Sequence, residues 1–179
     1  MKKRASPTPL IVMTIGHSTR ASKEFIQLLK AHQVQRLVDV RTVPRSRHNP
    51  QFNRSALSPA LHSSSFHYSY FPGLGGFRHA RRDSLNTGWH NASFRGFADY
   101  MQMTESRENL EELINLAKSE QIAIMCAEAV PLRCHRSLIA DVLLAHGIEV
   151  WEITSATRTQ HAHPYALGQD HWKAGHLSC

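Results

Sequence analysis

Short apolar runs alternate along the chain with segments in which apolar residues recur every three or four positions. The runs are bounded by glycine or polar residues and are typical of strands that are buried on both faces of a parallel sheet. The segments with helical spacing predict amphipathic helices between these strands. The predicted strands are residues 10–15, 36–41, 121–125 and 148–153, and the predicted helices begin at Ser22 and cover residues 106–119 and 137–146.

This alternation predicts the fold class. We expect a single α/β domain over residues 10–155, with a central, mostly parallel sheet and helices on both of its faces. Residues 1–9 and 156–179 are expected to be flexible termini. Residues 42–98 contain no long periodic segment and are rich in proline and glycine, so they are expected to form a long, basic, loop-rich insertion.

The composition is that of an ordinary globular domain, because 41% of the 179 residues are hydrophobic and 20% are charged. No run approaches the roughly 18 apolar residues of a membrane-spanning helix, so we expect a cytoplasmic protein without a membrane partner. The three cysteines are an odd number, which argues against a disulfide framework. Cys126 and Cys134 are therefore expected to be reduced thiols.

The formal net charge of +7 is concentrated in the middle of the chain. Between Arg45 and Phe97 there are seven arginines and one acid, Asp83, which together give +6. Aromatic residues are interleaved with these arginines, and Tyr68, Tyr70 and Phe77 are candidates for stacking against a base. Arginine among aromatic side chains suits phosphates and stacked bases, so the expected partner is an anionic ligand, a nucleotide or a nucleic acid.

Three predicted strands end in polar, chemically capable residues. These strand ends are residues 16–19, 39–46 and 126–136. Because ligands of parallel sheets bind beyond the carboxyl ends of the strands, we expect all three segments to meet at one edge of the sheet. A helix that starts directly after residue 136 would add N–H groups and a dipole that favour anions.

The segment 126–136 is the most informative stretch of the chain. Cys126, at a strand end, is the favoured functional thiol, because arginines and a helix N-terminus stabilise a thiolate. Cys134 begins the apolar stripe of the next helix, which favours a packing role. Alternatively, Cys126, Cys134 and His135 could bind zinc, with His17 or His48 completing the site.

The acidic residues near the strand ends need partners. Asp39 closes a very apolar strand, and its expected partner is Arg41 or Arg136. Glu128 is expected to pair with one of the same two arginines, and it could then orient a substrate or act as a general base. His17 and Ser18 either bind substrate or cap the following helix.

Separated motifs of the chain also resemble a known family. They are Thr14 to Ser18, Val38 to Arg41 with Pro44 and Ser46, Leu74 to Gly76, Phe97 to Met101, and Met125 to Glu128 with Cys134 to Arg136. In this order they resemble the bacterial and archaeal domain of unknown function 488 family over about residues 12–155. The resemblance implies a single α/β domain with the paired polar motifs as its site, and it implies no particular reaction.

The leading hypothesis is a cytoplasmic hydrolase or transferase that acts on a phosphate-bearing substrate, either a nucleotide or a nucleic acid. The alternatives are a non-catalytic nucleic-acid-binding or regulatory module and a zinc-dependent enzyme; otherwise no cofactor is expected. The candidate catalytic residues are Cys126, Glu128, His17 and Asp39. The candidate substrate-binding or phosphate-binding residues are Ser18, Arg41, Ser46, Tyr70, Gly75, Gly76, Arg78, Arg133, Cys134, His135 and Arg136.

Overall fold

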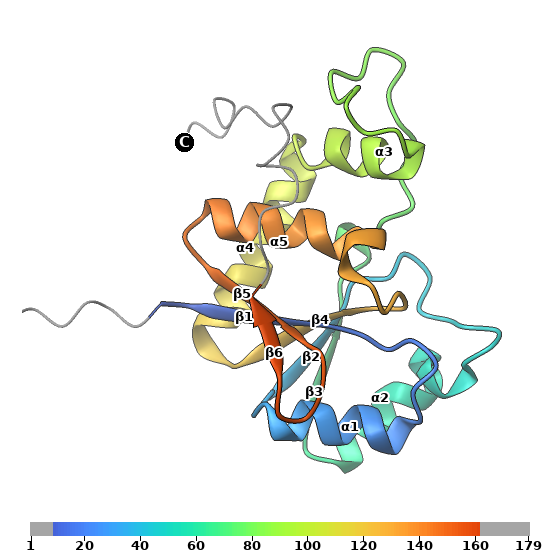
Figure 1. The fold of residues 1–179 in the computed structure, drawn as a ribbon, viewed down its shortest axis with the longest axis vertical. Coiled ribbons are helices and arrows are strands. Elements are labelled where there is room, and N and C mark those ends of the chain that lie inside the picture. The colour runs from blue at the N-terminus through green and yellow to red at the C-terminus, as the bar shows by residue number, and fades with distance from the viewer. Residues whose placement is uncertain (1–8, 162–179) are drawn as a thin grey trace, which may run out of the picture.

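The computed structural model describes residues 9–161 and is built on a sheet with the strand order β3-β2-β4-β1-β5-β6 (Figure 1). Five strands are parallel, and β6 pairs antiparallel to β5 at one edge. The α/β class expected from the sequence is thus confirmed. The strands are β1 Ile11–Gly16, β2 Arg36–Asp39, β3 His67–Tyr70, β4 Ile122–Cys126, β5 Glu149–Ile153 and β6 Thr159–His161.

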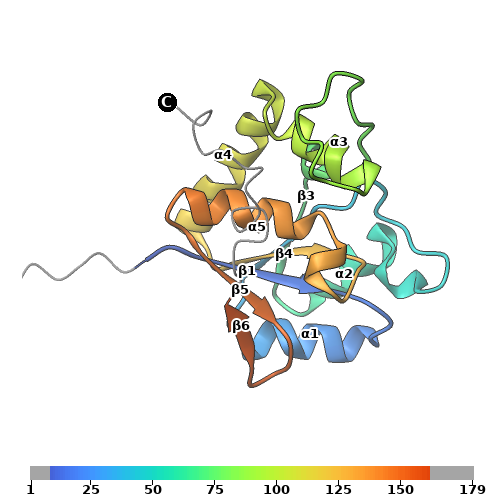
Figure 2. The ribbon, with the colours of Figure 1, turned by 45° about the horizontal axis from the view of Figure 1, so that its top comes forward.

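Helices cover both faces of this sheet (Figures 1 and 2). One face carries α1 Ser22–Ala31 and α2 Arg54–Ser63, and the other carries α3 Ala92–Tyr100, α4 Thr104–Ser119 and α5 Arg136–Ala145. Three short 3-10 turns, Pro50–Phe52, Pro72–Leu74 and Pro131–Arg133, lie in the connecting segments.

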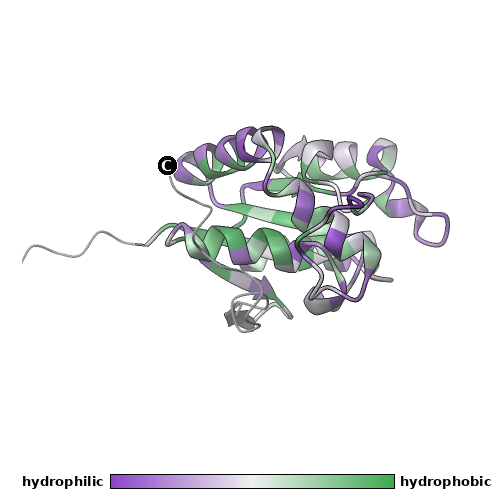
Figure 3. Cartoon of the chain, turned by 90° about the horizontal axis from the view of Figure 1, so that it is seen from above, coloured by the Kyte–Doolittle hydropathy of each residue, from purple (hydrophilic) through white to green (hydrophobic). Residues whose placement is uncertain are grey.

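Strands β1, β2, β4 and β5 contribute residues to two separate cores. In β4, Ile122 and Ile124 pack with α4 and α5, whereas Ala123 and Met125 pack with α1 and α2. All four are fully buried, which explains why the strand reads as a continuous apolar run. Hydrophobic strands therefore lie between the two helix layers (Figure 3).

Residues 42–98 are not the loop-rich insertion that the sequence predicted. They contain α2 and β3, and β3 pairs in parallel with β2, so this segment completes a regular β-α-β unit of the sheet. The strand was missed because β3 is an edge strand of sequence His-Tyr-Ser-Tyr with no fully buried residue. The helix was missed because α2 has only two buried apolar residues, Leu57 and Leu61, and contains Pro59.

The other predicted elements are observed with small shifts at their ends. The sheet also continues beyond residue 155, the expected end of the domain, because residues 159–161 form β6. The remainder of the expected C-terminal tail, residues 162–179, and residues 1–8 lie outside the described residues. Within residues 9–161, none of the helices combines the length and apolar character needed to cross a membrane.

Candidate functional site

The three polar strand ends meet at one edge of the sheet, as the sequence predicted. Strand β4 lies between β2 and β1, and its carboxyl end is bonded to both neighbours. The His17 and Ser18 N–H groups donate to the carbonyls of Cys126 and Ala127 at 2.9 Å, and the Val40 N–H donates to Met125 O at 3.0 Å. The segments that follow the three strands therefore form one continuous surface.

Gly16 allows the closest approach at this edge. A Cβ atom at residue 16 would collide with the backbone of Glu128 and Ala129. Only glycine lets the loop after β4 lie directly against the end of β1. This explains why a glycine ends the first apolar run.

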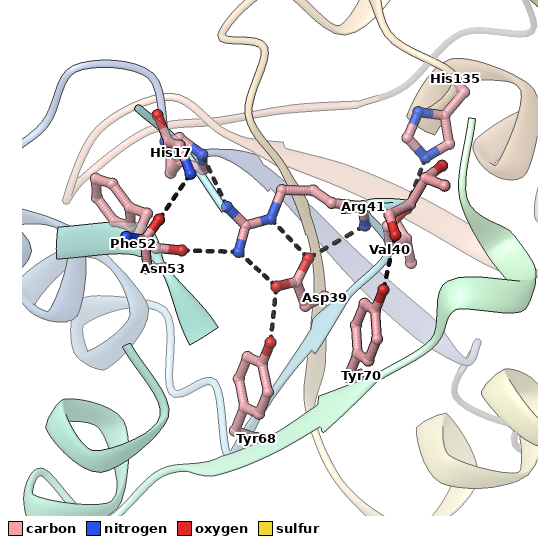
Figure 4. Close-up of polar contacts among 11 residues, drawn as sticks. His17, Asp39, Val40, Arg41, Phe52, Asn53, Tyr68, Tyr70 and His135 are labelled. Carbon is pink, nitrogen blue, oxygen red and sulfur yellow. Dashed lines mark hydrogen bonds and ion pairs between the residues drawn. The ribbon is translucent and has the colours of Figure 1, made fainter. Parts of the chain in front are cut away.

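Asp39 and Arg41 form a buried ion pair behind this edge (Figure 4). The Arg41 Nη2 atom lies 2.6 Å from Asp39 Oδ2, and its Nε donates to Oδ1 at 2.8 Å. The Tyr68 hydroxyl donates to Asp39 Oδ2 at 2.7 Å, and Arg41 also donates to Phe52 O at 2.8 Å. Burial and the Asp39 charge raise the pKa of Tyr68 above its ordinary value, so its hydroxyl remains protonated. Asp39 is thus fully bonded, and its observed partner is Arg41, one of the two arginines that the sequence suggested.

His17 belongs to the same network. Its Nδ1 lies 2.8 Å from Ser18 O, its Nε2 lies 3.3 Å from Arg41 Nη1, and its ring stacks on Phe52 at a centroid distance of 4.2 Å. Because a carbonyl only accepts and a guanidinium only donates, these partners assign the proton to Nδ1 and leave Nε2 as an acceptor. Burial lowers the pKa of His17 to about 4, which also favours this neutral form. His17 therefore supports Arg41 from behind the surface.

Arg136 forms a second buried pair, with Glu152 of β5. Its Nη2 lies 3.2 Å from Glu152 Oε1, and the Thr14 hydroxyl donates to Glu152 Oε2 at 2.7 Å. Burial lowers the pKa of Arg136 and raises that of Glu152. The expected pairing of Arg136 with Asp39 or Glu128 was wrong, because α5 packs on β5 and places Arg136 directly against Glu152, which was not recognised as a partner from the sequence.

Glu128 lies on the surface in the loop after β4. Its Oε1 accepts the Val130 N–H at 3.2 Å, and it makes no ion pair within the described part of the chain. The expected pairing with Arg41 or Arg136 was wrong: Arg41 is bonded to Asp39, and Glu128 acts on the buried Arg136 only through its charge, which raises the pKa of Arg136 against the larger effect of burial. Glu128 is therefore accessible to a ligand.

A pocket of about 380 Å³ opens beyond the carboxyl ends of β2 and β4. Seven predicted site residues line it: Arg41, Gly76, Cys126, Glu128, Arg133, Cys134 and His135. The other lining residues are Thr42, Val43, Arg45, Phe77, Asn91, Ser93, Phe94 and Ala127. Asn91, Ser93 and Phe94 were missed as site residues because only the tertiary fold brings the start of α3 to this edge. Their one local signal is the N-cap pattern, in which the Asn91 side chain accepts from the Ser93 and Phe94 N–H groups.

Other predicted binding residues do not line this pocket. Arg78 is held by the carbonyls of Gly73 and Gly75, and its guanidinium lies 3.6 Å from the centroid of the Tyr100 ring. The Tyr70 hydroxyl donates to Thr42 O at 2.8 Å. Of these partners, Thr42 lines the pocket, so Tyr70 contacts a wall residue.

The two predicted serines also have local partners. Ser46 Oγ accepts the Asn49 N–H at 3.0 Å, which orders the turn after β2. The backbone of Ser18 has a φ of 51°, and its carbonyl accepts from His17. Neither serine lines the pocket.

The two cysteines were expected to be separate reduced thiols, but the structure pairs them. Their sulfur atoms are in direct contact, and the Cα atoms are 7.6 Å apart. His135 lies beside the pair, with Nδ1 3.6 Å from Cys134 Sγ and Nε2 3.0 Å from Val40 O (Figure 4 shows the Val40 contact). Burial lowers the pKa of His135 to about 4, so its ring is neutral near pH 7.

The zinc alternative needed His135 as a third ligand beside the two cysteines, and His17 or His48 as a fourth. Among residues 9–161, no three histidine, cysteine, aspartate or glutamate side chains are grouped so that they could hold a metal ion. His17 lies in the Arg41 network, and the Nε2 of His135 is directed at Val40 O. The residues present therefore do not fit a tetrahedral zinc site.

A sheet covered by helices on both faces, with a polar pocket beyond adjacent strand ends, defines an α/β protein with a strand-end site. The chain belongs to the family described as Domain of unknown function DUF488, whose family model matches residues 21–143. This match confirms the resemblance seen in the sequence motifs. No curated protein and no solved structure shows significant similarity to the chain.

Proposed function

We propose that the protein is an enzyme that acts on a small phosphate-bearing molecule of the nucleotide class in the strand-end pocket. The observation that carries this proposal is the composition of the pocket mouth. Arg45 and Arg133 line the pocket, both are exposed, and neither side chain has a hydrogen bond or ion pair within residues 9–161. Two unengaged guanidinium groups at the mouth of a pocket suit a phosphate group.

An aromatic side chain beside these arginines supports a nucleotide over inorganic phosphate. Phe77 lines the pocket and is 76% exposed, which is unusual for a large apolar side chain. Its ring is available to stack against a planar base. Phe94 lines the same pocket and stacks on Trp89 at a centroid distance of 5.5 Å, which gives a firm wall.

The arginines, and not the helix N-terminus, would hold the anion. The first N–H groups of α5 already donate to Cys134 and His135. Arg41, which was expected to hold phosphate, is already engaged by Asp39 and Phe52. Glu128 is the acidic side chain among the described lining residues and is the candidate for proton transfer.

Part of residues 42–98 forms the pocket wall, and this favours a small ligand over a polymer. Gly76, Phe77 and the start of α3 line this space together with the residues that follow β4. The resulting pocket volume of about 380 Å³ lies in the usual range for small-molecule sites.

Binding of nucleotides to single-residue variants tests the proposal. Arg133→Ala should weaken nucleotide binding about tenfold or more, because a hydrogen bond to a charged group contributes about 1.5–3 kcal/mol. Phe77→Ala should weaken nucleotide binding about fivefold or more and leave inorganic phosphate binding unchanged, because only the nucleotide has a base to stack. Isothermal titration calorimetry with mononucleotides, triphosphates, nucleosides and phosphate measures both effects.

Arg82→Ala is the matched control, because Arg82 is exposed and does not line the pocket. Equal affinities of the Arg133→Ala and Arg82→Ala variants would refute the site. Equal losses in both variants, together with tight and strongly salt-dependent binding of DNA or RNA, would instead support the polymer-binding alternative.

A further inference from the structure

The paired cysteines lie in the floor of the pocket, where both residues are buried, with Cys126 2% and Cys134 6% exposed. Cys126 ends β4, Cys134 lies two residues before the start of α5, and both residues line the pocket. Their sulfur atoms touch each other, although the loop of residues 127–133 separates them in the sequence. Two adjacent sulfur atoms beside a pocket suit thiol chemistry, and the phosphate-binding role does not use them.

The surroundings of the Cys134 sulfur favour a thiolate. The Arg136 N–H, in the first turn of the ten-residue helix α5, donates to Cys134 Sγ at 3.5 Å. A helix N-terminus stabilises negative charge at this position. The thiolate is the nucleophilic form of a cysteine.

His135 is placed to accept the proton of this thiol. Its Nε2 lies 3.0 Å from Val40 O, and since a carbonyl can only accept, Nε2 carries the ring proton. The lone pair of Nδ1 then faces Cys134 Sγ at 3.6 Å. Cys134 is thus the nucleophile, His135 is its base, and the Val40 carbonyl orients the base. This is the arrangement of other activated nucleophiles.

Cys126 has a different environment. Its sulfur lies 3.8 Å from Glu128 O, an acceptor that favours the protonated thiol. No ring nitrogen within the described residues is bonded to it. The asymmetry makes Cys134 the attacking sulfur and Cys126 the sulfur that resolves the intermediate.

We propose that Cys126 and Cys134 form a redox-active dithiol that reduces small anionic disulfides in the pocket. This inference rests on the pocket of the proposed function and does not depend on a phosphate group. The Cys134 thiolate attacks one sulfur of the substrate, and one thiol leaves with the proton that His135 had accepted. The Cys126 thiol then loses its proton to the second leaving sulfur and attacks Cys134, so that the second thiol is released. The dithiol loses two electrons and the substrate disulfide gains them.

The charge of the pocket mouth sets the substrate preference. The unengaged Arg45 and Arg133 attract carboxylate-bearing disulfides and repel cationic ones. Glutathione disulfide and cystamine are suitable probes, because both are small disulfides and they carry opposite charge.

The test is the reaction of the reduced full-length protein with each probe, followed by intact mass and peptide mapping. Cys179 is changed to serine in every sample so that only the pair can react. Glutathione disulfide should convert the protein to the Cys126–Cys134 disulfide with no glutathione attached, and about tenfold faster than cystamine does. Arg133→Ala should remove most of this preference, and Arg82→Ala should retain it.

Single cysteine variants separate the two roles. Cys126→Ser should stop at a mixed disulfide of glutathione on residue 134, and Cys134→Ser should react at least about tenfold more slowly. The proposal is overturned if Cys134→Ser reacts as fast as Cys126→Ser, or if glutathione stays attached when both cysteines are present. The second result needs no variant of either cysteine, so it holds even if a variant fails to fold.

The outcomes of the two proposals are distinguishable. Disulfide reduction without nucleotide binding would refute the proposed function and leave the dithiol assignment in place. Nucleotide binding by a protein that forms no Cys126–Cys134 disulfide would refute the dithiol alone.

Discussion

Asp39→Ala is expected to lower the free energy of unfolding by about 3–5 kcal/mol, the usual loss when one partner of a buried ion pair is removed. Asp39 is 0% exposed and Arg41 is 5% exposed, so the guanidinium would remain buried without its counter-charge. The Tyr68 hydroxyl would lose its acceptor at the same time. Because a domain is typically stable by only about 5–15 kcal/mol, this single change threatens the folded state. Urea unfolding followed by circular dichroism measures the loss.

The control for this prediction is Asp83→Ala. Asp83 also pairs with an arginine at 2.8 Å, but both side chains are largely exposed, at 72% for Asp83 and 63% for Arg81. Water and salt screen such a pair, so no measurable change is expected. If Asp39→Ala were as stable as Asp83→Ala, the Asp39 network would not support the fold, and a role of Asp39 in the reaction would have to be reconsidered.

Acid is expected to destabilise the protein through His17, and the effect should span the interval between about pH 6.5 and pH 4. The unfolded chain binds a proton at the ordinary pKa of 6.5, whereas burial lowers the pKa of His17 in the folded state to about 4. Between these values the unfolded state binds more protons, so the free energy of unfolding falls as the pH falls. The stabilising effect is fully present above pH 6.5 and is lost through this interval. The shift corresponds to roughly 3 kcal/mol.

His17→Gln isolates this effect, because buried carboxylates and His135 also respond to acid. The variant should be less stable near neutral pH, and its free energy of unfolding should change by roughly 3 kcal/mol less between about pH 7 and pH 4. His62→Gln is the control for the loss of a histidine side chain, since His62 is exposed on α2. A His17→Gln variant with the same pH dependence as the starting protein would contradict the assignment of a neutral, buried His17.

These two results would also distinguish the residues that stabilise the strand-end edge from the residues that bind or react with a ligand there. Asp39, Arg41 and His17 form a bonded layer behind the surface, in which Arg41 alone reaches the pocket wall. Arg133, Glu128 and the cysteine pair line the pocket itself. Loss of stability is expected from changes in the first group, and loss of binding or reaction is expected from changes in the second.

The spacing of apolar residues along the chain, together with the composition, determined most of the fold. Residues 10–15, 36–41, 121–125 and 148–153 are mostly buried, and strands buried on both faces appear in the sequence as continuous apolar runs. Their alternation with helices dictates a parallel sheet, and a parallel sheet brings its strand ends to one edge. The convergence of residues 16–19, 39–46 and 126–136 followed from this rule without any contact being known.

The tertiary structure alone decided the rest, because several decisive contacts join residues that lie far apart along the chain. Edge strand β3 has no apolar run, since water takes the place of a neighbouring strand at one side. Arg136 pairs with Glu152, sixteen positions away, and the sequence spacing offered nearer acids. The meeting of the two cysteine sulfurs depends on how the loop of residues 127–133 folds back over β4. Local periodicity reports which face of an element is buried, whereas only the packed fold reports which side chains meet there.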